Sequence, residues 1–178
     1  PLSLHDALPI SPIAQKMARL TPADAVLIVM FIGLANALGR VMWGFISDKI
    51  GRLNALLTMF AVTAIAMFLL PGMATEKASL LIDVMIIGTC FGGYLGTFPS
   101  VCADYFGTKH LTVNYALLFS AFSVAAIIGP RVAGEIAVKT GTYIDAFIIA
   151  AVVSIVGTAC TVVTIVLAKL RARKQQSA

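Results

Sequence analysis

Residues 146–168 read AFIIAAVVSIVGTACTVVTIVLA, a run of 23 residues without a charged side chain. A helix needs about 20 mostly apolar residues to cross the hydrocarbon core of a bilayer. Three more uncharged runs of 20 to 22 residues cover 53–74, 84–103 and 111–130, and a fifth apolar run over 25–47 is broken only by Arg40. Backbone polar groups in lipid must be satisfied within their own segment, so these runs predict an all-α membrane protein with five transmembrane helices.

The composition of the chain excludes several classes of protein. Its 178 residues are 60% hydrophobic and 12% charged, whereas an average soluble domain has about 25% charged residues. A soluble globular domain and a disordered chain are therefore excluded. The net charge of +5 is not gathered into a dense basic segment, so we expect no nucleic-acid partner.

The charge gaps also predict the spans and their orientation. We expect helices over 24–47, 53–71, 80–103, 112–138 and 144–168, within a transmembrane portion of 12–170. Short connections make consecutive helices antiparallel. One side of this arrangement carries seven basic residues (Lys49, Arg52, Lys109, Lys169, Arg171, Arg173, Lys174) and the other carries four (Lys16, Arg19, Lys77, Lys139). The more basic side is normally cytoplasmic, which predicts an inner or plasma membrane protein with a cytoplasmic tail over 171–178.

Residues 1–11, PLSLHDALPIS, have neither an apolar span nor the layout of a signal peptide. They resemble the translated read-through of a sequencing adapter, so we expect a non-native leader on a truncated chain; the alternative is a short extracellular loop. Asp83 and Asp145 lie near the ends of expected spans, where we expect both to be solvated. Cys90, Cys102 and Cys160 sit in apolar runs without metal-ligand spacing, which predicts small buried hydrophobes and no metal site.

Arg40 is the most informative residue, because a guanidinium within a span is costly unless it meets protein or water. It lies eight residues before Asp48, about 12 Å from the cytoplasmic end, and Asn36 precedes it by one turn. The planar fork of arginine suits carboxylates. The functional hypothesis is therefore an anion-binding group in a watery cavity; the alternative is a structural ion pair or a snorkelling side chain.

Other polar and aromatic positions allow two interpretations each. Arg131 and Glu135 are four residues apart and predict either a self-paired charge row or a gate or proton-coupling carboxylate. Gly88, Gly92 and Gly96 form a row of small residues that permits close approach of another helix. Aromatic residues in the third and fourth spans favour packing, with a ligand-lining wall as the alternative: Phe91, Tyr94, Phe98, Phe119 and Phe122.

Catalytic motifs are missing from the sequence. It has no GxSxG, no HExxH and no phosphate-cradling glycine loop, and neither His5 nor His110 has a second ligand at metal spacing. We therefore expect that the protein is not an enzyme and has no cofactor.

Residues 44–52, GFISDKIGR, connect the first two expected spans on the cytoplasmic side. They resemble the loop motif of the major facilitator superfamily, in which a glycine is followed by three residues, an aspartate, a basic residue, one residue, a glycine and an arginine. The resemblance implies that Gly44, Asp48, Gly51 and Arg52 support conformational switching. Physically, we expect the glycines to let two helix ends pack tightly and Arg52 to hold Asp48.

Five further stretches are similar to the oxalate/formate antiporter family within that superfamily. They are NALGR at 36–40, FPSVCADYFGTK at 98–109 followed by Asn114-Tyr115 and Gly129-Pro130, and SPIAQ at 11–15, which is similar to the stretch after the family's seventh helix. The resemblance covers 11 to about 145. It implies that the five spans are helices 8–12 of a twelve-helix transporter, most of a C-terminal half whose N-terminal partner half is missing.

The same resemblance implies roles for individual residues. Arg40 matches the basic residue that holds substrate carboxylate in the oxalate carriers. Phe91 falls on an aromatic cavity residue, and Leu95 replaces another. Phe122 stands where the oxalate carriers have a lysine. A second carboxylate without its own cation is costly to bury, which favours a monocarboxylate such as formate, lactate or pyruvate over oxalate.

Taken together, these features predict a secondary active transporter of small organic anions that works by alternating access. Arg40 and Asn36 would bind the anion, and Phe91, Tyr94 and Phe122 would shape and dry the cavity. A counter-anion or protons would drive transport, and the lipid bilayer and the missing N-terminal half would be its other partners. The alternatives are a facilitator carrier of a non-anionic metabolite and a membrane sensor that binds a ligand without moving it.

Overall fold

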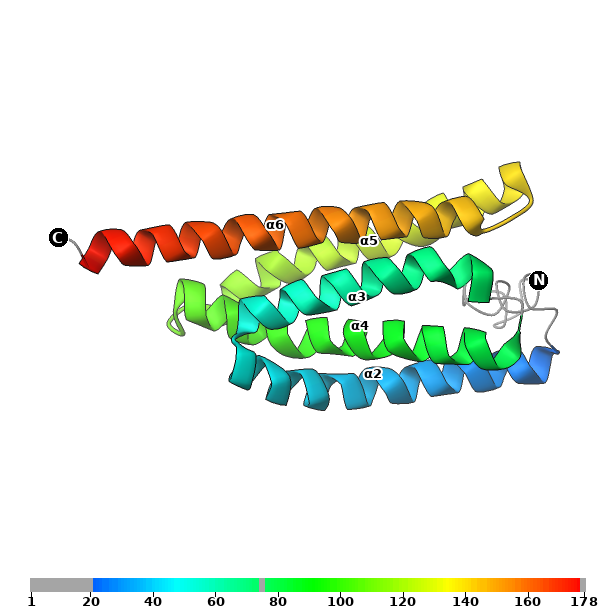
Figure 1. Ribbon diagram of the computed structural model, residues 1–178, viewed down its shortest axis with the longest axis horizontal. Coiled ribbons are helices and arrows are strands. Elements are labelled where there is room, and N and C mark those ends of the chain that lie inside the picture. The colour runs from blue at the N-terminus through cyan, green and yellow to red at the C-terminus, as the bar shows by residue number, and fades with distance from the viewer. Residues whose placement is uncertain (1–20, 74–75, 177–178) are drawn as a thin grey trace.

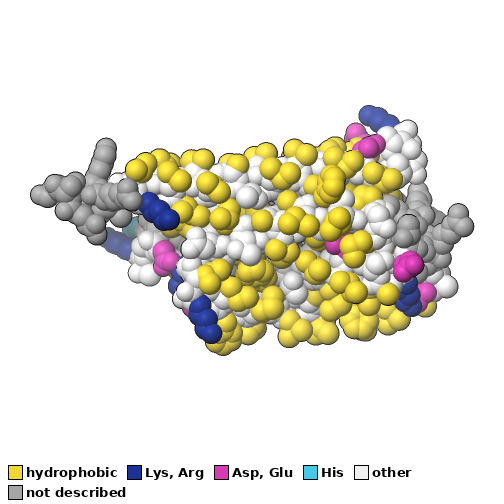
Figure 2. All heavy atoms as spheres, in the orientation of Figure 1, with side chains coloured by type: hydrophobic (Ala, Val, Ile, Leu, Met, Phe, Trp, Pro, Cys, Tyr) yellow, Lys and Arg dark blue, Asp and Glu magenta, His cyan; other side chains and the backbone are white. Residues whose placement is uncertain are grey.

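The computed structural model describes residues 21–73 and 76–176. These residues form five helices, α2 (Pro22–Ile50), α3 (Arg52–Met73), α4 (Lys77–Phe106), α5 (Leu111–Thr140) and α6 (Ile144–Gln176), and no strand. All five are long and apolar enough to cross a membrane. They lie side by side along the long axis of the molecule (Figure 1), and charged side chains gather mainly at the two ends of the bundle (Figure 2). The predicted all-α class with five spans is confirmed.

A seam of glycines joins α2 to α4 along much of their length. A Cβ on Gly92 would overlap the carbonyl oxygen of Asn36, and a Cβ on Gly39 would overlap the backbone of Thr89. A Cβ on Gly88 or Gly96 would be in tight contact, at 3.2 and 3.1 Å, with the carbonyl oxygens of Ile32 and Arg40. Because later residues of α2 contact later residues of α4, the two helices run parallel. The small-residue row predicted from the sequence thus has α2 as its partner.

Helix α3 lies between α4 and α6 (Figure 1). One apolar cluster near the end of α3 contains Ile28, Leu70, Leu80 and Phe147, and so joins α2, α3, α4 and α6. A second cluster, around Trp43, Met59 and Cys90, packs α3 against α2 and α4. These two clusters form the core of the bundle.

Helix α5 lies at the edge of the bundle and has no buried residue. Every residue from 120 to 132 is exposed. Its contacts with α4 and α6 are few, so one long apolar side of this helix has no partner within the described chain.

A single residue, Gly51, separates α2 from α3. Its φ of 90° lies in a region that favours glycine, and its N–H donates to the carbonyl of Ser47 at 3.0 Å. At the opposite end of the bundle, Asp24 accepts a hydrogen bond from Lys77 and forms an ion pair with it. This pair connects the start of α2 to the start of α4. The bundle is therefore tied at both ends.

Two sequence expectations about burial are wrong. Asp83 is only 2% exposed, because it lies on the side of α4 that packs inside the bundle. Cys160 is exposed on α6, whereas Cys90 and Cys102 are buried as expected. Asp145 is exposed. The leader expected over 1–11 lies outside the described residues, and the tail begins within α6, which runs to Gln176.

Candidate functional site

Arg40 lies in the second half of α2, ten residues or about 15 Å before Ile50. Its Nε donates a hydrogen bond to Oδ1 of Asn36, one turn earlier, at 3.3 Å. The side chain is exposed, and no acidic group among the described residues lies within ion-pairing distance of it. The guanidinium therefore keeps most of its donors free for another acceptor.

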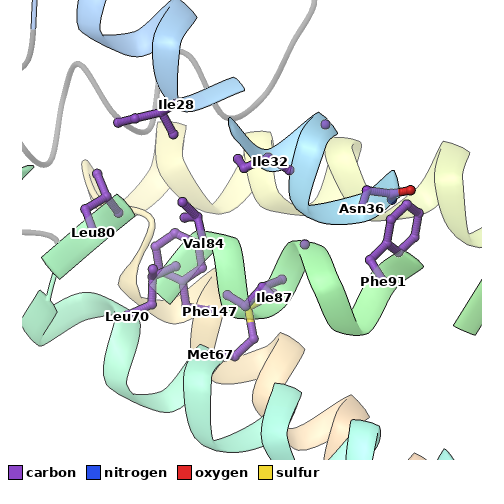
Figure 3. A pocket seen from close by; sticks show the side chains of 12 residues that line it. Ile28, Ile32, Asn36, Met67, Leu70, Leu80, Val84, Ile87, Phe91 and Phe147 are labelled. Atoms are coloured by element: carbon purple, nitrogen blue, oxygen red, sulfur yellow. The ribbon is translucent and has the colours of Figure 1, made fainter. Parts of the chain in front are cut away.

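A cavity of about 410 Å³ lies between α2, α3, α4 and α6. Asn36 and Phe91 lie at one end of it, and the remaining lining is apolar (Figure 3). Its lining residues are Ile28, Ile32, Gly33, Asn36, Met67, Leu70, Leu80, Val84, Ile87, Gly88, Phe91 and Phe147. Asn36 thus touches both the cavity and Arg40, which makes this end the polar end of an otherwise apolar space.

The predicted aromatic residues separate into two groups. Phe91 of α4 contacts Phe122 of α5, with ring centroids 5.9 Å apart, and Phe122 continues to Phe119 at 5.0 Å. Tyr94 instead packs on α3, where its hydroxyl is 3.1 Å from Oγ1 of Thr63 and its ring lies on Phe60. The structure brings Phe91, Phe122 and the Asn36 end of the cavity together through Phe91, and it places Tyr94 in the α3–α4 contact.

Arg131 and Glu135 are both exposed on α5. They line one shallow hollow together with Lys139. No ion pair joins them anywhere in the described chain, so the self-paired charge row that the sequence allowed is not formed.

The motif at 44–52 makes different contacts from those expected. Arg52 Nε lies 2.6 Å from Oδ2 of Asp104 at the end of α4, whereas its Nη2 is 3.9 Å from Oδ1 of Asp48. Arg52 therefore holds Asp104 closely and Asp48 only loosely. A Cβ on Gly44 would meet no described atom within 4 Å. No described helix therefore packs closely on Gly44, whereas the φ of 90° at Gly51 favours glycine there.

Asp104 is the close partner of Arg52 that the sequence interpretation missed. The signal was available, because Asp104 is an acid at the end of the third expected span, at the same end of the antiparallel arrangement as Arg52. Lys169 of α6 lines the same hollow as Arg52 and Asp104. The charged end of the bundle thus includes residues from α3, α4 and α6.

Comparison with known protein families now adds to this geometry. The family model described as Major Facilitator Superfamily matches residues 7–178. The chain belongs to the Major Facilitator Superfamily. This membership agrees with five apolar helices, a charged motif at the α2–α3 connection and an unpaired arginine within a span.

Three relatives within the superfamily indicate a narrower likeness. The chain is 34% identical to the oxalate:formate antiporter of Oxalobacter formigenes over 69% of this chain and 29% of that protein. It is 37% identical to apicoplast pyruvate carrier 2 of Toxoplasma gondii over 50% of this chain and 14% of that protein. It is 32% identical to monocarboxylate transporter 14 of Mus musculus over 75% of this chain and 26% of that protein. The chain thus spans less than a third of the length of these relatives.

Proposed function

We propose that this chain is part of a secondary active transporter that carries small organic anions across a cell membrane by alternating access. The five helices would be helices 8–12 of a twelve-helix protein, and an N-terminal half would complete the substrate cavity. Superfamily transporters place their substrate between the two halves near the middle of the membrane. The C-terminus would be cytoplasmic, in keeping with the seven basic residues on that side.

The observation that carries this proposal is that Arg40 has no acidic partner among the described residues. It lies within a span and has Asn36 as its hydrogen-bond partner, with no acid beside it in the described chain. A cation in this position is stabilised when an anion binds to it. The printed names of three relatives, an oxalate:formate antiporter, a pyruvate carrier and a monocarboxylate transporter, support a carboxylate as that anion.

The surroundings of Arg40 favour a substrate with one carboxylate. Asn36 beside it is uncharged, the neighbouring cavity is otherwise apolar, and Phe91 and Phe122 are aromatic. A second carboxylate in this region would be buried without a cation of its own, which is costly. We therefore propose formate, lactate or pyruvate as substrates ahead of oxalate, with transport driven by a counter-anion or by protons.

The test uses the full-length protein in proteoliposomes, with uptake and counterflow of these monocarboxylates as the measurements. Losing a charged hydrogen-bond partner costs about 1.5–3 kcal/mol, so Arg40→Gln should lower uptake at subsaturating substrate roughly 10- to 100-fold. Arg40→Lys should fall between wild type and Arg40→Gln, because lysine keeps the charge but loses the planar fork. Lys109→Gln, which removes an exposed cation in the connection between α4 and α5, is the control and should transport normally.

Each alternative gives a different result. Normal transport of the native substrate by both Arg40 variants contradicts the anion site and favours a carrier of a non-anionic metabolite. Ligand binding without counterflow in the wild type favours a sensor. The 178-residue chain alone should show no saturable uptake, because half of the cavity would be absent; robust uptake by this chain would contradict the proposed division of the site.

A further inference from the structure

A buried aspartate without a partner lies in the first part of α4. Asp83 is 2% exposed, and its Oδ2 has no hydrogen-bond partner. Two other buried side-chain atoms of the described chain share this condition, Trp43 Nε1 and Thr97 Oγ1, but neither of those groups gains or loses a proton in the physiological range. Asp83 is thus the one ionisable group among them.

The neighbouring elements explain why Asp83 has no partner. It shares a face of α4 with Cys90, seven residues on, and Cys90 packs against α3 residues such as Met59. The stretch of α3 that lies beside the start of α4, residues 64–70, is AIAMFLL and has no polar side chain. Residues 64–70 of α3 therefore offer the carboxyl group of Asp83 neither a hydrogen-bond donor nor a cation.

The charged and titratable groups of the surrounding elements do not supply one either. On α2 and α4, Asp24 and Lys77 are paired with each other, and Glu76 is exposed. On the α6 side, Asp145 is exposed and Tyr143 packs in the Leu80 cluster. Helix α3 has no charge beyond Arg52 at its far end. No hydrogen bond or ion pair joins Asp83 to any of these described residues.

A carboxylate without hydrogen bonds is strongly disfavoured in an apolar interior, and the neutral acid takes its place. The arrangement of α3 and α4 seen here is therefore compatible with Asp83 only in its protonated form. Ionised Asp83 would require water or a different packing of these helices. Protonation and helix packing are thus coupled at this residue.

We propose that Asp83 is a proton-binding residue of the transporter, which takes a proton from water when α4 is accessible from one side and holds it as the neutral acid in the packed conformation. The proton returns to water when the opposite side opens. This inference rests on the proposed transport function and assigns its coupling ion: one proton moves with one monocarboxylate, so the cycle carries no net charge.

The structure also offers a route for water to Asp83. Its neighbours Leu80 and Val84, three residues before it and one after it, line the cavity of about 410 Å³. A rotation of α4 that replaces these side chains would turn Asp83 toward the same space. Arg40 is level with Gly96 on α4, 13 residues or about 20 Å from Asp83 along the helix. The proton and the anion would therefore bind at separate levels of the protein.

The first arm of the test measures transport by the full-length protein in proteoliposomes with an imposed pH difference. With one proton per anion, each pH unit supports about tenfold accumulation of the monocarboxylate in the wild type. Asp83→Asn should retain counterflow exchange but lose this accumulation, and Asp83→Glu should retain accumulation. Asp145→Asn, which neutralises an exposed aspartate, is the matched control and should accumulate substrate like the wild type.

The second arm does not depend on transport. The infrared spectrum of the wild type at neutral pH should contain the carbonyl band of a protonated carboxylic acid, and the band should be missing from Asp83→Asn. Accumulation that is unchanged in Asp83→Asn, or exchange and accumulation reduced to the same extent, overturns the coupling role. If the wild type shows neither uptake nor counterflow, the proposed function fails while the infrared band still decides the state of Asp83; an identical spectrum in Asp83→Asn overturns the proton site itself.

Discussion

The Nε atom of Arg52 lies 2.6 Å from the Oδ2 atom of Asp104 and so ties the first residue of α3 to the last turn of α4. The side chains of the two residues are 32% and 52% exposed. Water therefore screens the attraction, so the pair contributes little to the stability of the fold.

A double-mutant cycle on Arg52 and Asp104 should give a small coupling energy. Exposed ion pairs contribute about 0.2–1 kcal/mol, so Arg52→Ala and Asp104→Ala should each lower stability slightly, and the double variant should lose less than the sum. Thermal unfolding of the full-length protein in detergent measures this, with Lys109→Ala as an exposed control at the same end. Strictly additive losses would show that the pair does not form in the folded protein.

Gly92→Ala should separate α2 from α4. The added Cβ overlaps the carbonyl oxygen of Asn36, and overpacking of this kind costs about 1–3 kcal/mol. Gly33→Ala is the matched control, because a Cβ there meets no described atom within 4 Å; alanine in a helix interior then stabilises by about 0.5–1 kcal/mol. Unfolding temperatures of both variants provide the comparison, and equal shifts in the same direction would contradict the glycine seam.

Asn36 should matter for substrate affinity through its hydrogen bond to Arg40. Asn36→Ala removes an orienting bond worth about 0.5–1.5 kcal/mol, which corresponds to roughly a 2- to 13-fold rise in the half-saturation concentration. Asn36→Asp should be more harmful, since a carboxylate beside Arg40 competes with the substrate anion. Uptake kinetics test both variants against Leu38→Ala, an exposed position on the same helix. An Asn36→Asp protein with wild-type affinity would rule out Arg40 as the anion site.

Stability should depend on pH through the Asp24–Lys77 pair. The hydrogen bond from Lys77, followed by that from Thr21, lowers the pKa of the Asp24 carboxyl from its usual value. The contribution of a group with a lowered pKa is present above its unfolded pKa, about 3.9 for aspartate, and is lost as the pH falls through the folded value. Lys77→Met should therefore reduce stability at neutral pH, and its difference from the wild type should disappear in strong acid.

The control for that measurement is Lys49→Met, an exposed lysine at the opposite end of α2 that takes part in no described ion pair. It should show the same pH profile as the wild type. A Lys77→Met deficit that persists unchanged below the folded pKa of Asp24 would mean that the lysine stabilises the protein by packing.

The sequence predicts the five helices well because lipid imposes a simple requirement on length and charge. The sequence predicts less well which helices pack against each other. Each helix has several faces, and apolar residues are spread almost evenly around it. Asp83 illustrates this limit: its position near the end of a span suggested solvent, but its face of α4 lies against α3. Tyr94 illustrates it again, since three residues after Phe91 the side chain contacts a different helix.

The candidate site was predicted in part. Arg40 and Asn36 could be identified as a pair from their spacing of four residues, which places them on one helical face. Arg52 could be identified from its motif, but its close partner could not, because Asp104 is 52 residues away in the sequence and meets it only through the packing of α3 on α4. The ion pair between Arg131 and Glu135, one of the two interpretations that their spacing allows, is not formed among the described residues.

The one-residue connection at Gly51 fixes the length of the chain between two helices. Each residue of a helix advances its side chains by about 100° around the axis. Inserting one amino acid beside Gly51 would therefore either lengthen the link or rotate α3 so that Met59 and Leu70 leave their places in the core. Insertions should be accepted far more readily in the longer connection between α4 and α5, where only the local turn would have to adjust.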